Sequence, residues 1–231
     1  MKEKLLLVNA DDFGYSDGVN RGIIDAHLRG IVTSTSVMVR ESGILSIQIL
    51  SNFPRLSVGL HFFIEDKELE TMLRSRASLE DSTLICLSEE LERQCGLFKT
   101  ITGRDPSHID SHHNIHFHPQ LMRMMMDYGL ENSVPIRNTY TRKLITDFYG
   151  GRGTGNKDRV GVDALLKILM HLPYGATELV CHPGLENAQL REKSSYTDLR
   201  EAELHTLTNT TIIDFIRTSG IKLVNRSEIG Y

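Results

Sequence analysis

The stretch LLLVNADDFG, residues 5–14, joins an apolar run to two adjacent carboxylates. The run has the composition of a buried β-strand, and Asp11 and Asp12 follow where that strand should end. Two like charges at the edge of a core cost free energy unless an opposite charge compensates them. The first question that the sequence raises is therefore which charge compensates this pair.

Strand-like runs alternate along the chain with longer segments of helical period. Strands are expected at residues 4–9, 32–39, 56–62, 107–112, 134–138, 177–182 and 221–225. Helices are expected at residues 17–29, 41–52, 88–102, 119–129, 162–171 and 199–218. This alternation is typical of right-handed βαβ units and a parallel sheet. We expect an α/β fold with one domain over residues 1–231, a distorted TIM-barrel-like (β/α)-barrel of about seven parallel strands, closed or nearly closed.

Two stretches interrupt this rhythm. Residues 63–87 are charged and irregular, and we expect a loop that caps the barrel. The stretch YGGRGTGNK, residues 149–157, is rich in glycine but lacks the spacing of a Walker motif. It is either a plain connector or, with Arg142, Lys143 and Arg152, a contact for an anionic part of a ligand.

Composition narrows the class of protein. The net charge is −4 and no block of basic residues stands out, which argues against nucleic acid and anionic membranes as partners. The apolar run near the start is too short and too polar for a signal peptide or a membrane span. The 3 cysteines lack a CxxC spacing, so a disulfide framework is not expected and a reducing compartment fits best. We expect a cytoplasmic protein.

Four polar clusters fall at the ends of expected strands. They are the pair Asp11-Asp12, His61 in VGLHF, the stretch HIDSHHNIHFHP at residues 108–119, and His182 in LVCHPG. Each alone has a simpler explanation: a helix cap, a core histidine, a solvated loop and a turn. In a parallel barrel, however, the carboxyl ends of the strands meet on one face, where such folds carry their active sites. The matching positions favour one shared site.

The histidine-rich stretch allows a finer prediction. If residues 108–112 are extended, Asp110 and His112 point to the same side, with His112 at the mouth of the barrel. Asp110, one pleat below, could then hold the ring of His112, as carboxylates often do for ligating imidazoles. His113, His116 and His118 fall in the following turn and helix and are weaker candidates for a metal.

One carboxylate and two imidazoles suit a divalent ion with open positions for water. We expect Asp12, His61 and His112 to bind it, with Asp11 left free as the base for a metal-bound water. His182, on the opposite rim, could donate a proton to a leaving group. This set is the equipment for metal-assisted hydrolysis of an amide or ester. Mg²⁺, Zn²⁺, Mn²⁺ and Co²⁺ are all compatible, with Mg²⁺ the first expectation and Zn²⁺ the second.

Other functions use similar ligands. Two histidines and a carboxylate also form the facial triad of non-haem iron oxygenases, usually on a double-stranded β-sheet sandwich. A metal-dependent phosphoesterase would want further ligands for a second metal, which His113 and His116 could supply. A sugar-binding or regulatory protein could keep the fold without turnover. The residues alone leave these alternatives open.

Five motifs resemble the YdjC-like carbohydrate deacetylases, which include chitooligosaccharide deacetylases. In chain order they are VNADDFGYSDGVNRGI, GIVTSTSVMV, GLHF, HIDSHHNIH and CHPG. The resemblance implies a (β/α)-barrel related to polysaccharide deacetylases, a divalent metal, and removal of acetyl groups from N-acetylglucosamine-type sugars.

The resemblance also carries residue roles. Asp12, His61 and His112 match the metal ligands and Asp11 matches the catalytic base. His182 stands where related deacetylases place an acid or an oxyanion-stabilising imidazole. Asn114 departs from the family, which often has a third consecutive histidine there.

The expected partner is a small acetylated sugar. Residues 63–87 match no motif, so which sugar is accepted stays open. A phosphorylated sugar is one option, in which Arg137 and the segment 142–157 would hold the phosphate. A homodimer is also left open, because Met122, Met124, Met125 and Met126 lie in one expected helix. They could line a subunit contact, although packing in the core of the chain itself is the simpler account.

Overall fold

A parallel β-sheet of seven strands organises the molecule. The fold is described from a computed structural model, which covers residues 3–40, 44–151 and 155–229. Within these residues the strand order is β4-β3-β2-β1-β6-β5, and β7 also pairs with β1. The strands are β1 (Lys4–Phe13), β2 (Ser34–Val37), β3 (Ser57–Phe62), β4 (Ile109–Ser111), β5 (Lys143–Ile145), β6 (Gly175–Cys181) and β7 (Ile221–Leu223).

The sheet is an open half-barrel. In the described part of the chain, β4 and β5 are the two ends of the sheet and do not pair with each other. The predicted parallel α/β architecture is confirmed, but the prediction of a closed or nearly closed barrel is wrong. The strand expected at residues 134–138 is reduced to one bridge between Ile109 and Ile136. Pro135 has no N–H to donate and Asn138 has a φ of 72°, so the segment cannot extend a ladder.

Helices follow most of the predicted ranges. The structure has α1 (Asp17–Arg29), α2 (Ile44–Gln48), α4 (Asp81–Thr102), α5 (Pro119–Asn132) and α6 (Val162–Met170). The helix expected at 41–52 therefore ends in the 3-10 turn η2 (Ile49–Asn52), and its residues 41–43 lie outside the described residues.

Three elements differ from the predicted ones. The expected loop 63–87 instead contains α3 (Lys67–Ser75) and the start of α4. Asp66 caps α3 by accepting from the amides of Glu68 and Leu69, and the helix buries Leu73. The single helix expected at 199–218 is divided into α8 (Asp198–Leu207) and α9 (Thr210–Thr218), with Asn209 as the cap of α9. A short helix, α7 (Ala188–Lys193), was not predicted.

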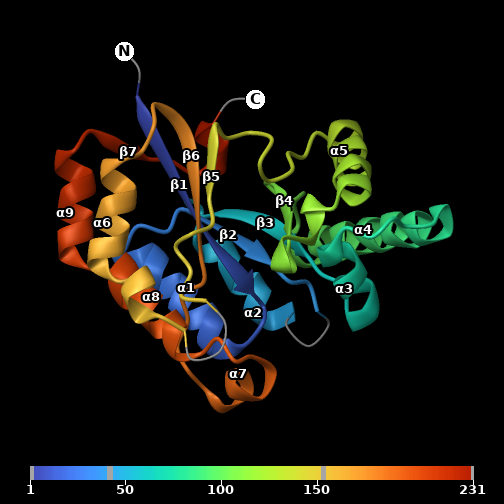
Figure 1. Cartoon of the computed structure of the whole chain (residues 1–231), viewed down its shortest axis with the longest axis horizontal. Coiled ribbons are helices and arrows are strands. Elements are labelled where there is room, and N and C mark those ends of the chain that lie inside the picture. The colour runs from blue at the N-terminus through green and yellow to red at the C-terminus, as the bar shows by residue number, and fades with distance from the viewer. Residues whose placement is uncertain (1–2, 41–43, 152–154, 230–231) are drawn as a thin grey trace.

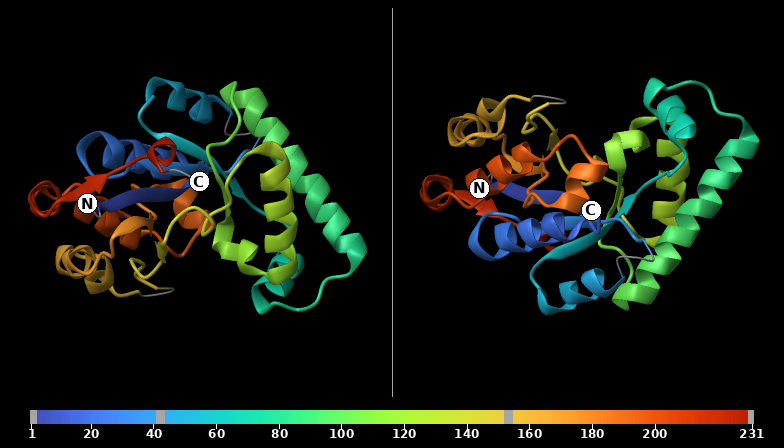
Figure 2. Two further views of the ribbon diagram at one scale, coloured as in Figure 1. Left: turned by 90° about the horizontal axis from the view of Figure 1, so that it is seen from above. Right: turned by 90° about the horizontal axis from the view of Figure 1, so that it is seen from below.

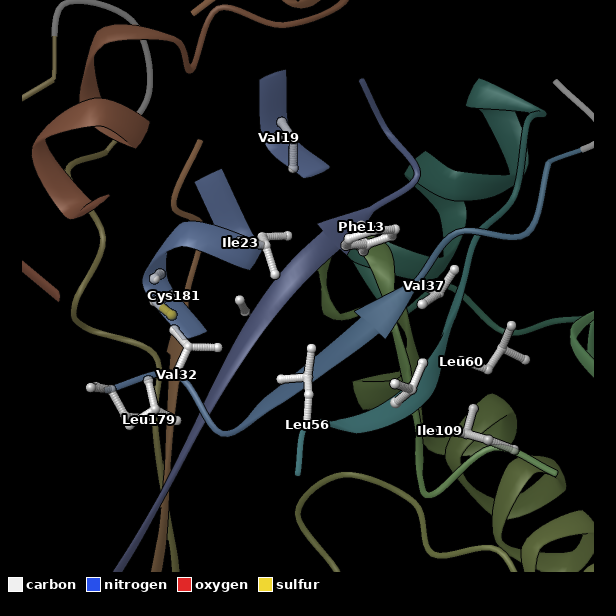
Figure 3. Close-up of a cluster of buried hydrophobic side chains, with 14 of the residues drawn as sticks. Phe13, Val19, Ile23, Val32, Val37, Leu56, Leu60, Ile109, Leu179 and Cys181 are labelled. Atoms are coloured by element: carbon white, nitrogen blue, oxygen red, sulfur yellow. The ribbon is translucent and has the colours of Figure 1, made fainter. Parts of the chain in front are cut away.

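Helices cover the sheet on two sides, as Figures 1 and 2 show. The helices α6, α8 and α9 lie on one side, whereas α3, α4 and α5 lie on the other, with α4 reaching furthest from the sheet. The core cluster joins side chains of α1 to those of the central strands. Figure 3 shows Val19 and Ile23 of α1 over the strands that carry Phe13, Val37 and Leu60.

The methionines of α5 belong mainly to the core of the chain. Met125 has no exposed surface, and Met122 and Met124 pack against the same cluster. Met126 is 42% exposed. Among the described helices, none combines the length and the apolar character that crossing a membrane requires.

Candidate active site

A bulge in β1 brings Asp11 and Asp12 to the site. The strand was predicted to end at residue 9, before the two carboxylates, but it continues through them to Phe13. Its register with β2 shifts between Ala10 and Phe13, and Asp12 adopts a φ of 74°. Successive side chains of a regular strand point to opposite faces, and a bulge re-aims them. Both carboxylates consequently line one cavity.

This cavity has a volume of about 520 Å³ and lies at the carboxyl ends of the strands. All five residues predicted for catalysis and metal binding line it: Asp11, Asp12, His61, His112 and His182. In the sheet order, β1 lies between β6, which leads to His182, and the strands β2 and β3, the latter carrying His61. The structure therefore brings the predicted residues together, with the two carboxylates in the middle.

Asp11 is not the free carboxylate that the sequence suggested. Arg137 grips it in a bidentate pair, with Nη1 at 2.9 Å from Oδ2 and Nη2 at 2.7 Å from Oδ1. The amide of Asn9 donates to Oδ1 at 2.8 Å. Burial favours the neutral acid, but Arg137 outweighs it and lowers the pKa of Asp11. Asp11 is thus an ionised carboxylate in a fixed orientation.

Arg137 itself is fully buried, so the suggestion that it holds a sugar phosphate is wrong. Its Nε donates to Glu178 at 2.7 Å and its Nη2 lies 2.6 Å from Asp110. The guanidinium compensates three carboxylates inside the half-barrel, Asp11 among them, and the third comes from β6. The sequence signal for this role is a lone arginine in VPIRN and a lone glutamate in TELVC, each inside an apolar run.

Asp110 holds His61, not His112 as predicted. Neighbouring strands β3 and β4 place His61 directly beside Asp110, and Nδ1 of the imidazole donates to the carboxylate at 2.5 Å. The other nitrogen, Nε2, lies 3.2 Å from Oδ1 of Asp12. Burial opposes a charge on the ring, but Asp110 and Asp11 outweigh it and raise the pKa of His61 to about 10.

His112 begins the 3-10 turn η3 (His112–Phe117) and lies near His61, with ring centroids 5.8 Å apart. The ring of His113 stacks on it at 3.8 Å, and His113 in turn contacts Glu70 of α3. Burial lowers the pKa of His112 to about 3, so its imidazole is neutral. Neutral imidazole is the form that binds metals.

Two further histidines of the stretch, His116 and His118, have structural partners. Nδ1 of His116 lies 2.6 Å from the hydroxyl of Ser111. His118 caps α5 by accepting from the amide of Leu121, and its Nε2 donates to the carbonyl of Ala77. The helix start predicted at this histidine is confirmed, and neither residue lines the cavity.

Asp12, His61 and His112 offer the ligand types that a divalent cation takes, one carboxylate and two imidazoles. A cation there would have to replace the proton on Nε2 of His61, since only a deprotonated nitrogen can bind a metal. Asp110 accepts from Nδ1 of His61 and so turns Nε2 towards Oδ1 of Asp12. A carboxylate on the other ring nitrogen is the usual partner of a metal-binding histidine. Burial raises and Arg200 lowers the pKa of Asp12, with a net shift well below its ordinary value, so an anionic oxygen is available.

Two groups of three ligand-type atoms come within 4.8 Å of one another in the described residues, and Asp12, His61 and His112 are not one of these groups. The two groups are Asp11, His61 and Asp110, and Glu70, His112 and His113. Arg137 already binds both carboxylates of the first group, which leaves that position unsuited to a cation.

His182 is held by its backbone. Its N–H donates to Oε2 of Glu203 at 2.5 Å, and its ring lies near those of Tyr149 and Tyr196, at 5.5 and 6.1 Å between centroids. Nδ1 is buried and has no hydrogen-bond partner within the described residues. Burial lowers the pKa of the imidazole, while Asp11 and Asp12 oppose this shift. Sequence reasoning missed Glu203 because nothing in its local sequence marks it.

The helix α1 supports the segment that follows His182. A Cβ at Gly22 would come within 2.5 Å of the Cα of Gly184, and one at Gly18 within 2.1 Å of the carbonyl oxygen of Leu185. The glycines therefore allow a backbone-to-backbone approach that no other residue permits. This contact explains two glycines of the motif DGVNRGI.

The glycine-rich stretch contributes one aromatic ring to the cavity. Tyr149 lines it, whereas Arg142 and Lys143 are not among its lining residues. Arg152, the third cation proposed for an anion contact, lies outside the described residues.

Comparison with known proteins agrees with these features. Residues 5–218 match the family described as YdjC-like protein. A chitooligosaccharide deacetylase of Serratia marcescens is 33% identical, covering 96% of this chain and 97% of that protein. A carbohydrate deacetylase of Brevibacillus brevis is 30% identical, covering 97% and 99%.

Solved structures show the same fold. A putative cellobiose-phosphate cleavage protein of Enterococcus faecalis superimposes with a TM-score of 0.79 at 25% identity, covering 98% of each chain. A peptidoglycan deacetylase of Bacillus subtilis has a TM-score of 0.55 at 14% identity, covering 98% of this chain and 89% of that one. By the match over most of its length, the chain belongs to the YdjC-like family.

Proposed function

We propose that this protein is a metal-dependent carbohydrate deacetylase that removes N-acetyl groups from N-acetylglucosamine-type oligosaccharides. One observation carries the proposal: a single cavity gathers an ionised Asp11, the donor set Asp12, His61 and His112, and the imidazole of His182. The names of the Serratia and Brevibacillus relatives support the substrate class.

Asp12, His61 and His112 would hold the cation. When bound there, a divalent ion would polarise the acetamide carbonyl and lower the pKa of water in the cavity. We propose Mg²⁺ or Zn²⁺ as this ion, since one carboxylate and two imidazoles can bind either.

Asp11 acts as the general base. It accepts the proton of the attacking water, because it is ionised and because Arg137 and Asn9 fix its orientation. His182 donates a proton to the departing nitrogen. Asp11 and Asp12 favour the protonated ring that this step needs, but burial outweighs them in the free protein and lowers the pKa of the imidazole. The C–N bond breaks, and the products are acetate and an amino sugar.

Acetate release from N,N′-diacetylchitobiose, with Mg²⁺ or Zn²⁺ added, tests the function. We expect Asp11→Asn to lower kcat by about 10²–10⁴, the usual contribution of a general base. The matched control is Asp127→Asn, which replaces an exposed carboxylate of α5 and should keep the wild-type rate. Deacetylation by Asp11→Asn at nearly the wild-type rate, in a variant whose circular dichroism is unchanged, would refute the assignment.

A metal-dependent phosphoesterase is the second candidate function. The second group of ligand-type atoms, Glu70, His112 and His113, adjoins the proposed metal site and could serve a second ion. The Enterococcus protein is named for a phosphorylated disaccharide, so phosphorylated sugars belong in the assay. Phosphate release without acetate release would favour this rival. An iron oxygenase is disfavoured, because the sheet is parallel and covered by helices.

A further inference from the structure

The helix α8 holds the peptide groups of His182 from two sides. The N–H of His182 donates to Oε2 of Glu203, and its carbonyl oxygen accepts from Nη1 of Arg200 at 3.4 Å. Arg200 and Glu203 are three residues apart, so they lie on one face of the helix. Both are buried, with 4% and 0% of their surface exposed. The proposed acid is thus anchored by its backbone while its ring faces the cavity.

Arg200 extends this anchor to the proposed metal site. Its Nη2 donates to Oδ2 of Asp12 at 2.7 Å, and its Nε donates to the carbonyl of Tyr196 at 3.1 Å. The rings of Tyr15 and Tyr196 flank the guanidinium, with centroids at 5.9 and 5.7 Å. A planar fork with five donors can serve several acceptors at fixed angles, which a lysine cannot do.

Glu203 connects this anchor to the stacked rings of Tyr149 and Tyr196. Its second oxygen accepts from the hydroxyl of Tyr196 at 2.5 Å, and that hydroxyl accepts from the amide of Gly150 at 3.0 Å. Tyr149, the neighbour of Gly150, stacks on Tyr196 with centroids 4.6 Å apart. Two positions of α8, one helical turn apart, therefore contact Asp12, His182 and Tyr196.

We propose that Arg200 and Glu203 are positioning residues for the proposed deacetylation, and that Arg200 fixes the position of Asp12 relative to His182. Arg200 occupies Oδ2 of Asp12, so the carboxylate offers only Oδ1, the oxygen nearest His61, to a cation. Neither residue is assigned a bond to substrate. The inference rests on the proposed function, since it concerns the roles given there to Asp12 and His182.

The first test measures the binding of Mg²⁺ and of Zn²⁺ alone, by calorimetry without sugar. Arg200→Met removes a positive charge near the cation, which favours binding, but it frees Asp12 to rotate, which opposes binding. We expect the second effect to dominate and the affinity to fall about 10–100-fold, the usual cost of losing a partner of a ligand. Arg191→Met, an exposed arginine of α7, is the matched control and should bind as the wild type does.

The second test separates the two contacts of Arg200. Arg200→Lys keeps one charge but cannot reach both Asp12 and His182. We expect metal affinity within about threefold of the wild type, together with a kcat lowered at least 10-fold and an unchanged KM. Glu203→Leu should likewise lower kcat while sparing metal affinity. Glu203→Gln, which keeps an acceptor for the N–H of His182, should restore most of the rate.

The outcomes are distinct. A wild-type protein that binds neither ion, or that releases no acetate, contradicts the proposed function. A wild type that does both, with Arg200→Met or Arg200→Lys matching it in affinity and kcat, overturns the positioning role. If Arg200→Met does not fold, the kcat values of Arg200→Lys, Glu203→Leu and Glu203→Gln decide whether the positioning role holds. Equal losses of kcat in Glu203→Leu and Glu203→Gln would also overturn the proposal.

Discussion

Glu203 has no exposed surface, and burial raises the pKa of its carboxyl to about 7 from an ordinary 4.5. Hydrogen bonds from Tyr196 and His182 oppose this shift without cancelling it. Between these two values the folded protein keeps a proton that the unfolded chain has lost. The wild type therefore loses stability as the pH rises from about 4.5 to 7, by about 3 kcal/mol from this group alone.

Glu203→Gln cannot titrate, so it should lack this loss. We expect its free energy of unfolding, relative to the wild type, to increase between pH 5 and pH 8. Urea denaturation at the two pH values measures the change. Glu192→Gln, an exposed glutamate of α7, is the control and should show no such trend. A difference between Glu203→Gln and the wild type that stays constant with pH would contradict the prediction.

The sequence predicted which acidic and histidine residues meet in the cavity, but it did not predict the arginines that pair with them. Asp11, Asp12, His61, His112 and His182 were grouped because each lies at the end of an expected strand, and the carboxyl ends of parallel strands meet on one face. Their partners come from elsewhere in the chain: Arg137 lies 126 residues from Asp11, and Arg200 lies 188 residues from Asp12. An ion pair between such distant residues leaves no periodic signal in the sequence.

At the scale of elements, the close contact between α1 and the segment after His182 supports the site. Gly22→Ala would place a Cβ against backbone atoms of Gly184, which cannot rotate away as a side chain can. We expect a loss of about 1–3 kcal/mol in the free energy of unfolding, the usual cost of overpacking. Deacetylation should also slow, because the displaced segment carries His182.

Gly96→Ala is the matched control for this prediction. Gly96 lies inside α4, and a Cβ there would meet nothing within 4 Å. The substitution should stabilise the protein by up to about 1 kcal/mol through helix propensity. Thermal unfolding and acetate release, measured for both variants, check the pair. Gly22→Ala with the stability and activity of Gly96→Ala would show that the close approach does not matter.

Local patterns predicted the type of most elements but not every boundary. Residues 17–29 form a helix with the predicted limits, because Ser16 caps it and apolar residues follow at helical spacing. The charged segment 63–87 was misjudged because Leu73 is the fully buried residue of α3 and most of the others are exposed. The division at Asn209 was missed because helical periodicity continues on both sides of it.

At the scale of the whole molecule, a network of buried charges fills the half-barrel. Arg137 is the partner of Asp11, Asp110 and Glu178. Arg137→Met would leave three buried carboxylates without it, and removing one partner of a buried pair typically costs 3–5 kcal/mol. We expect at least that loss in the free energy of unfolding at pH 7, measured by urea denaturation. Arg217→Met, an exposed arginine of α9, should be nearly neutral.

The same variant should be less impaired in acid. In the wild type, the lowered pKa values of Asp11 and Asp110 contribute stability at neutral pH that is lost as the carboxylates become protonated. Without Arg137 these values rise, so the folded variant takes up protons at a higher pH. The gap in stability between wild type and variant should narrow from pH 7 to pH 4.5. A gap that widens would refute this account of the network.

The open sheet shows where prediction of the whole fold stops. Alternating strands and helices were enough to predict a parallel α/β fold, but closure depends on whether two edge strands meet. Pro135 and the left-handed backbone of Asn138 prevent a strand at 134–138, and the edge strand is Lys143–Ile145 instead. That choice is made by single residues and not by the overall pattern.

The pairing of β1 with β7 has a consequence for synthesis on the ribosome. Residues 4–6 bond along one edge to residues 221–223, which are synthesised much later. Until then this part of β1 presents open amide and carbonyl groups that invite pairing with other chains. The growing chain therefore lacks this partner until β7 has been synthesised, which makes it vulnerable to aggregation and gives chaperones a defined edge to shield.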